Sequence, residues 1–174
     1  MPRFAESTTV PVERSRAEIE ETLRKYGASE FHSGWRADAA MVMFRIRELF
    51  IRFVLPFPAR NEKRFTHKKT RGRDVSMSEL QRQRAYEQEL RSRWRALLLV
   101  IKAKLEAVEC GISSIEKEFL AFILMPNDQV MGDWIIEKVL PSVRDGQMPT
   151  LALGYEKPKP EDENIEDAEF QEKK

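Results

Sequence analysis

The densest run of charged side chains lies between Arg60 and Arg73. Seven of these fourteen residues are basic and only Glu62 is acidic, which gives a local formal charge of +6 in a chain whose formal net charge is +1. The basic residues are Arg60, Lys63, Arg64, Lys68, Lys69, Arg71 and Arg73. Cationic groups at this density attract polyanions, because each phosphate that they neutralise releases condensed counterions. The run makes nucleic acid the leading candidate partner.

Two aromatic residues could add contacts with bases. Phe65 lies inside the basic run without apolar neighbours in sequence. It could anchor the segment to the rest of the protein, or it could offer a ring on which an unpaired base stacks. Trp35 is a second stacking candidate. Because the run mixes Arg and Lys without a recognition helix, it favours contacts with the nucleic-acid backbone over the reading of bases.

Residues that could support catalysis or hold a metal ion are sparse. The chain has one cysteine, Cys110, and two histidines, His32 and His67, with no spacing typical of metal ligands. The sequence contains neither a glycine-rich phosphate loop nor a G-x-S-x-G motif. We therefore expect a protein that is not an enzyme and needs no metal or cofactor. We expect Cys110 to be a small buried thiol at the end of a helix.

Helical periodicity indicates the elements that surround the basic run. Apolar residues at helical spacing predict one helix over 12–26 and a long helix over 78–109. Ser76 and Glu79 are spaced as a capping box for the long helix. Trp94 lies on the apolar face of that helix, where we expect it to belong to the core.

Two shorter helices should follow the long one. Ser113 and Glu116 have the spacing of a capping box for the first of them, which should run to Pro126. Asn127 or Asp128 could cap the second helix, which carries Trp134 on its apolar face.

Alternating apolar residues between 31 and 55 predict three antiparallel strands. Val42, Phe44 and Ile46 share one face of the second strand, and Ile51, Phe53 and Leu55 share one face of the third. The opposite face carries Arg45, Arg47 and Arg52. These arginines could contact phosphates together with the basic run, or they could form an ordinary solvated surface.

Together these patterns predict an α+β fold, in which an N-terminal helix precedes a three-stranded antiparallel meander that packs on the long helix. We expect one domain over residues 12–150, with a flexible leader at 1–11 and a basic loop without secondary structure at 57–77. Residues 151–174 should form a disordered acidic tail, because eight acidic residues and four lysines dominate the sequence from Glu156 onward. No stretch of about 18 apolar residues and no signal pattern occur, so we expect a cytoplasmic protein.

Three segments resemble a family of small, uncharacterised proteins encoded by bacteriophages and prophages. They are V-P-V-E-R-S-R-A-E-I-E-E-T-L-R-K-Y-G-A (10–28), I-R-F-V-L-P-F-P (51–58) and R-W-R-A-L-L-L-V-I-K-A-K-L-E-A-V-E-C-G-I-S (93–113). The similarity covers about residues 8–150. It implies a phage protein in the host cytoplasm that acts in DNA metabolism or against host defences, and it assigns no role to any residue.

The sequence thus supports two hypotheses of different classes. The first is a phage nucleic-acid-binding protein that prefers single-stranded DNA and contacts its backbone through the basic loop and the sheet arginines. The second is an interaction or inhibitor module that docks on a host protein through the basic loop or the acidic tail. The acidic tail could also compete with nucleic acid for the basic loop. Self-association is compatible with both hypotheses.

Overall fold

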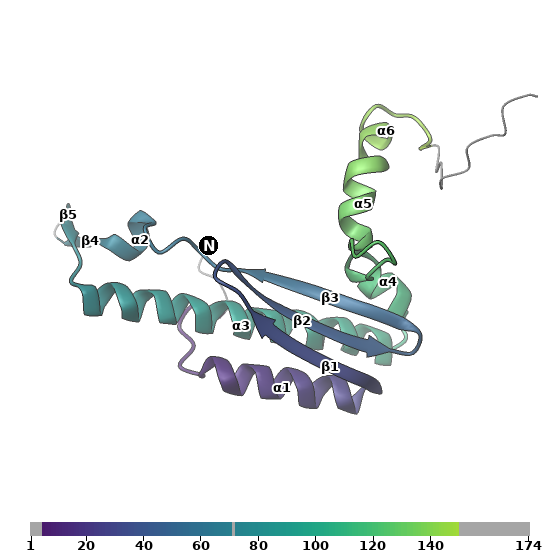
Figure 1. Ribbon diagram of the computed structural model, residues 1–174, viewed down its shortest axis with the longest axis horizontal. Coiled ribbons are helices and arrows are strands. Elements are labelled where there is room, and N and C mark those ends of the chain that lie inside the picture. The colour runs from purple at the N-terminus through teal and green to yellow at the C-terminus, as the bar shows by residue number, and fades with distance from the viewer. Residues whose placement is uncertain (1–4, 71, 150–174) are drawn as a thin grey trace, which may run out of the picture.

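The structure, a computed structural model, describes residues 5–70 and 72–149 (Figure 1). A three-stranded sheet lies over two helices that run side by side. The helices are α1 (Val12–Lys25) and α3 (Glu79–Glu109), and the strands are β1 (Ala28–Trp35), β2 (Ala39–Ile46) and β3 (Leu49–Pro56). The strands pair in the order β1-β2-β3, and both pairs are antiparallel. The predicted α+β fold and its antiparallel meander are confirmed.

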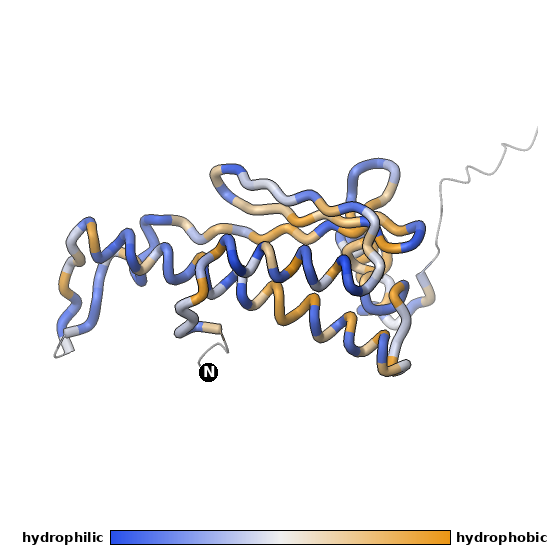
Figure 2. Tube along the Cα trace, turned by 90° about the horizontal axis from the view of Figure 1, so that it is seen from below, coloured by the Kyte–Doolittle hydropathy of each residue, from blue (hydrophilic) through white to orange (hydrophobic). Residues whose placement is uncertain are grey.

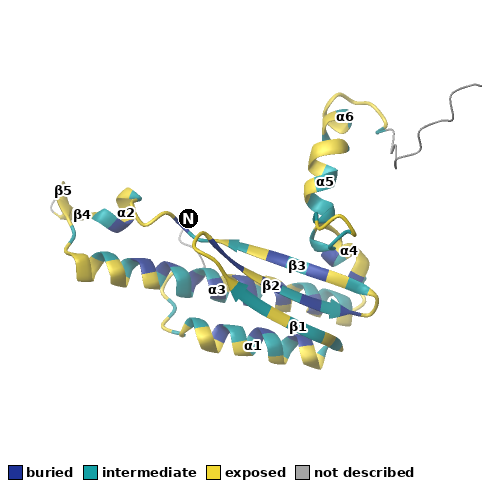
Figure 3. Ribbon diagram, viewed as in Figure 1, coloured by how far each residue is buried: buried dark blue, intermediate teal, exposed yellow. Residues whose placement is uncertain are grey.

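The alternation of the strand residues explains why this sheet buries one face. Val42 pairs with Phe53 and Phe44 pairs with Ile51, so all four side chains lie on the face that meets the helices, and all four are buried. Figure 3 shows buried segments along β2, β3 and α3, and in Figure 2 apolar residues recur along the strands and the helices. From the helices, the core receives Ile19, Leu23, Trp94, Leu97, Leu98, Ile101 and Leu105.

The N-cap of the long helix lies two residues after the predicted one. Ser78 is the N-cap: its Oγ accepts a hydrogen bond from the Gln81 backbone N–H at 3.4 Å, and Gln81 Oε1 accepts from the Ser78 N–H at 3.1 Å. The predicted pair of Ser76 and Glu79 is wrong, because Ser76 pairs with His67 in a β-ladder and is not available as a cap.

The helix that follows α3 is shorter than predicted. Ser114, not Ser113, caps α4 (Ile115–Phe119) by accepting a hydrogen bond from the Lys117 N–H. The Ser113 N–H instead bonds to the Ala107 carbonyl, where it helps to close the end of α3. A 3-10 turn, η1 (Leu120–Phe122), ends this helical stretch well before Pro126.

The chain then pairs with the sheet before it forms its last helices. Ile123 forms a β-bridge with Ile51 at the free edge of β3, which explains why the helix does not continue. Val130, rather than Asn127 or Asp128, is the N-cap of α5 (Met131–Lys138), and α6 (Leu140–Arg144) follows directly. Both helices stand away from the sheet (Figure 1) and have no buried residue, so Trp134 is only half-buried.

The basic segment between β3 and α3 is structured, which corrects the prediction of a loop. It contains one helical turn, α2 (Lys63–Thr66), and a hairpin of β4 (His67–Thr70) and β5 (Arg73–Ser76). Gly72 adopts a positive φ of 79° at the tip of the hairpin, a conformation that glycine reaches without strain. The two strands could not be predicted from alternating apolar and polar residues, because every residue of both strands is exposed.

The structure describes part of the predicted leader but none of the predicted acidic tail. Part of the predicted leader is packed: Ala5 is buried, and the Gln88 side chain donates hydrogen bonds to the Glu6 and Thr8 carbonyls. The predicted acidic tail at 151–174 lies outside the described residues, as do residues 1–4. In the described parts of the chain, no helix combines the length and the apolar composition needed to span a membrane.

Candidate nucleic-acid interface

The segment 60–76 is called the basic arm below. Its described residues extend along the N-terminal part of α3 and end in the β4–β5 hairpin (Figure 1). The hairpin is exposed on both faces, since all eight residues of its strands are exposed. The register places Lys68, Thr70 and Arg73 on one face and Lys69 on the other. Within the described residues, Lys68, Lys69 and Arg73 have no ion-pair partner. These three cations are therefore available to an anionic ligand.

Phe65 attaches the arm to the protein. Its side chain is 3% exposed and meets the Tyr86 ring of α3 edge to face, with 5.5 Å between the ring centroids. Arginine side chains cover both rings: Arg64 lies 4.7 Å from the centroid of Phe65, and Arg60 lies 4.3 Å from that of Tyr86. Of the two roles predicted for Phe65, the structure supports that of an anchor, because a buried ring offers no face to a base.

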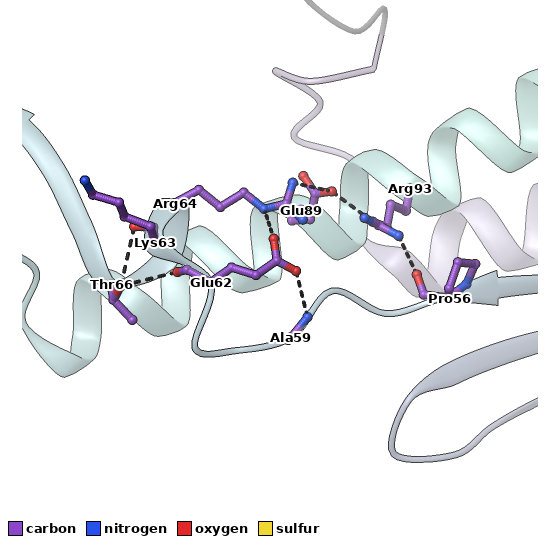
Figure 4. A network of polar contacts seen from close by, with 8 residues as sticks. All are labelled: Pro56, Ala59, Glu62, Lys63, Arg64, Thr66, Glu89 and Arg93. Carbon is purple, nitrogen blue, oxygen red and sulfur yellow. Dashed lines mark hydrogen bonds and ion pairs between the residues drawn. The ribbon is translucent and has the colours of Figure 1, made fainter.

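A network of ion pairs fixes the base of the arm (Figure 4). The Glu62 carboxylate accepts hydrogen bonds from the Ala59 N–H at 2.8 Å and from Arg64 Nε at 2.7 Å. Arg64 also reaches Glu89 of α3 at 3.3 Å, and Glu89 accepts a second hydrogen bond from Arg93 at 2.8 Å. Glu89 is only 7% exposed, so both arginines serve to neutralise a buried carboxylate.

Lys63 is also engaged within the arm. Its Nζ lies 2.5 Å from Asp74 Oδ2 on the hairpin. The hydrogen bond and the positive charge of Lys63 lower the pKa of the Asp74 carboxyl below its ordinary value. Thus Lys63 and Arg64, which the sequence assigns to phosphate binding, hold α2 and the hairpin in place, whereas Arg71 lies outside the described residues.

The three sheet arginines are paired with carboxylates and are not gathered near the arm. Arg45 contacts Glu30 at 3.2 Å, and Arg47 contacts Glu116 at 3.1 Å. Arg47 belongs to the β2–β3 turn, which Figure 1 shows at the opposite end of the sheet from the arm.

Arg52 is the most constrained of these three arginines. It donates hydrogen bonds to Asp128 Oδ1 at 2.8 Å and to the Asp128 carbonyl at 2.6 Å, and its side chain is 17% exposed. Asp128 has a positive φ of 63°. Arg52 therefore fastens the turn before α5 to the outer face of the sheet, and it offers little surface to a phosphate.

The other chemically reactive groups of the described residues lie apart from one another. Cys110 is exposed, not buried as predicted, because it is the C-cap of α3 and follows the last core position of that helix. Desolvation and the neighbouring Glu106 carboxylate raise the pKa of its thiol, which disfavours the nucleophilic thiolate. Among the described residues, no three His, Cys, Asp or Glu side chains are grouped so that they could hold a metal ion.

Comparison of the chain with protein-family models, with curated proteins and with solved structures gives no match. The resemblance to phage proteins therefore stays a prediction.

The sequence reasoning missed two acidic residues that organise the arm, Asp74 and Glu89. One signal pointed to Glu89: it lies three positions after Tyr86 on the face of α3 that contributes Leu97 to the core. A charged residue at such a position needs a partner. No comparable signal existed for Asp74, because its pairing with Lys63 depends on the fold of the hairpin.

Proposed function

We propose that this protein binds nucleic acid without catalysing a reaction, and that the basic arm contacts the phosphate backbone. The observation that carries this proposal is the exposure of Lys68, Lys69 and Arg73 on a hairpin that is anchored at its base. A fixed hairpin presents its cations without the cost of ordering a flexible loop. Single-stranded DNA is the favoured ligand, because Trp35 is 79% exposed and its ring could stack on an unpaired base.

The proposal differs from the sequence hypothesis in the residues that contact phosphate. Lys63, Arg64 and the three sheet arginines have carboxylate partners, so they support the fold of the protein. The hairpin cations and Arg60 carry the interaction. The phage context implied by the sequence resemblance would place this binding in phage DNA metabolism or in action against host defences.

The proposal is tested by fluorescence anisotropy with labelled single- and double-stranded oligonucleotides over a series of salt concentrations. Three hairpin contacts and one from Arg60 predict a log–log slope of about −3 for a single strand, because each contact contributes about −0.7. Absence of binding at the lowest salt would overturn the proposal and favour the alternative, a module that docks on a host protein.

Replacing Asp74 with asparagine should strengthen binding. The substitution removes the only described carboxylate of the hairpin and frees Lys63 for a phosphate. The salt slope should become steeper by about 0.7, which corresponds to about fivefold tighter binding near 0.1 M salt. The same anisotropy titration measures the effect, with Glu79→Gln at the start of α3 as a control of equal charge change. Weaker binding by D74N would mean that the Lys63–Asp74 pair is needed to shape the interface.

Removal of residues 156–174 should also strengthen binding at low salt. The acidic tail has a formal charge of −4, and a tethered anion competes with nucleic acid for the cations of the arm. The gain should disappear at high salt, where both interactions are screened. If the truncated chain binds with unchanged affinity at low salt, the tail does not compete with nucleic acid for the arm.

A further inference from the structure

A cleft of about 710 Å³ lies next to the basic arm. Four segments form its walls: the start of α1, the β1–β2 turn, the chain that follows β3, and the part of α3 between Tyr86 and Trp94. Pockets for small molecules typically enclose about 300–1,000 Å³. The cleft therefore has room for a nucleotide, and Arg60 belongs both to its wall and to the arm.

Aromatic rings line this cleft. Tyr86 and Trp94 are buried in its floor, and Phe57 is half-buried beside them. Trp35 lies at its mouth with 79% of the residue exposed. Trp35 pairs with Ala40, whose side chain is buried, so the indole lies on the helix-facing side of the sheet at its open end. An exposed indole beside a cleft of aromatic residues suits a planar ligand that is covered on binding.

The polar residues of the cleft are mainly arginines. Arg16, Arg36, Arg60 and Arg91 line it, against the two acidic residues Glu13 and Glu87. Among the described residues, Arg36 pairs with Asp38 at 2.7 Å, whereas the other three arginines have no carboxylate partner. Arg91 is held by two hydrogen bonds to Gln88 Oε1, at 2.7 and 3.2 Å. The cleft therefore combines aromatic surface with uncompensated positive charge.

Arg16 is the most precisely placed of these groups. Its Nη2 donates a hydrogen bond to Ser33 Oγ at 2.7 Å, and its guanidinium lies 5.9 Å from the Trp94 ring centroid. Its Nε is buried without a hydrogen-bond partner. A buried donor without an acceptor costs free energy. Because this nitrogen has almost no accessible surface, a ligand in the cleft would reach it only after the Arg16 side chain moved.

We infer that this cleft binds an unpaired nucleobase together with its phosphate, at the foot of the basic arm. The base would stack on Trp35, and the phosphate would meet Arg60 or Arg91. This inference rests on the proposed function and deepens it, because a cleft that accepts one base at a time selects single strands. In a duplex both faces of the base are stacked and its pairing edge is occupied, so entry would require unstacking.

Two variants of Trp35 and two single strands test the inference in the full-length chain. The strands are an oligothymidylate and an oligomer of equal length built from abasic sugar-phosphate units. Trp35→Ala should weaken binding of the oligothymidylate by about 5- to 150-fold, the range expected for the loss of one stacked base. Binding of the abasic strand should not change. Trp35→Phe should keep most of the affinity, and Ile112→Ala, which removes an exposed apolar side chain beyond the far end of α3, should keep all of it.

The abasic strand also separates this inference from the proposed function. If the wild-type chain binds both strands with equal affinity, or if W35A weakens both equally, the base-binding cleft is wrong and the arm remains. If the chain binds the oligothymidylate but not the abasic strand, the backbone contacts of the arm are wrong and the cleft remains. Binding of neither strand overturns both.

Discussion

Replacing Lys68, Lys69 and Arg73 together with alanine is expected to weaken binding of single-stranded DNA about 100-fold at 0.1 M salt. Each lost phosphate contact removes about 0.7 from the log–log salt slope, so three contacts remove about two units of the slope and two powers of ten in affinity at that salt concentration. The fold should not change, because all three side chains are exposed and none has an ion-pair partner among the described residues. Anisotropy measures the affinity, and circular dichroism checks the fold.

A second triple variant controls for net charge. Lys102, Lys117 and Arg144 are exposed on α3, α4 and α6, and replacing them with alanine removes the same charge at sites away from the arm. This variant should bind single-stranded DNA almost as tightly as the wild type. If the two triple variants lose affinity equally, the interaction depends on overall charge, and the arm has no special role.

The second large effect is expected from Phe65→Ala. Truncation of a fully buried phenylalanine costs about 3–5 kcal/mol, and the peripheral position of Phe65 favours the lower value. The loss should be local, because α2 packs on α3 and β4 packs on α2, and neither has extensive contacts with the three-stranded sheet. Hydrogen exchange should therefore show faster exchange of the Phe65, Thr66 and Met77 amides, which donate to backbone carbonyls of the arm. The amides of β2 should keep their protection.

Val75→Ala is the matched control for this prediction. Val75 is an apolar residue of the same arm but is 43% exposed, so its truncation should leave the exchange rates of the arm unchanged. The opposite result for Phe65 would be informative. If F65A keeps the protection of the arm and yet loses affinity for DNA, Phe65 is a stacking residue and its burial is not its role.

The sheet and the two main helices could be predicted because their buried residues recur with the period of the element that carries them. Phe44 and Ile51 follow the period of two that a half-buried strand requires, and Leu98 and Leu105 follow the period of a helix that packs on one side. The helix starts were predicted less well. Several serines compete to cap α3 and α4, and the β-ladder that engages Ser76 decides the outcome for α3.

The structure of the basic arm could not be predicted from the local sequence pattern. Its charge was evident from the sequence, but its hairpin was not, because a ribbon exposed on both faces needs no alternation of apolar residues. The ion pairs that separate structural cations from free ones join distant positions, such as Arg52 with Asp128 and Arg64 with Glu89. Likewise, the cleft draws Trp35 and Arg91 from segments that only the fold brings together. The sequence therefore identifies the charged segment, but only the tertiary structure shows which of its cations are free to bind an anionic ligand.

The central claim is that the hairpin of the basic arm contacts nucleic acid, and NMR mapping tests it most directly. A single-stranded oligonucleotide is titrated into the uniformly ¹⁵N-labelled full-length chain at low salt, and the backbone amide shifts are followed. We predict large changes at residues 67–70 and 72–76, with smaller changes around Trp35 and almost none in the β2–β3 turn near Arg47. Large changes at that turn or on the outer face of the sheet, with an unperturbed arm, would contradict the account.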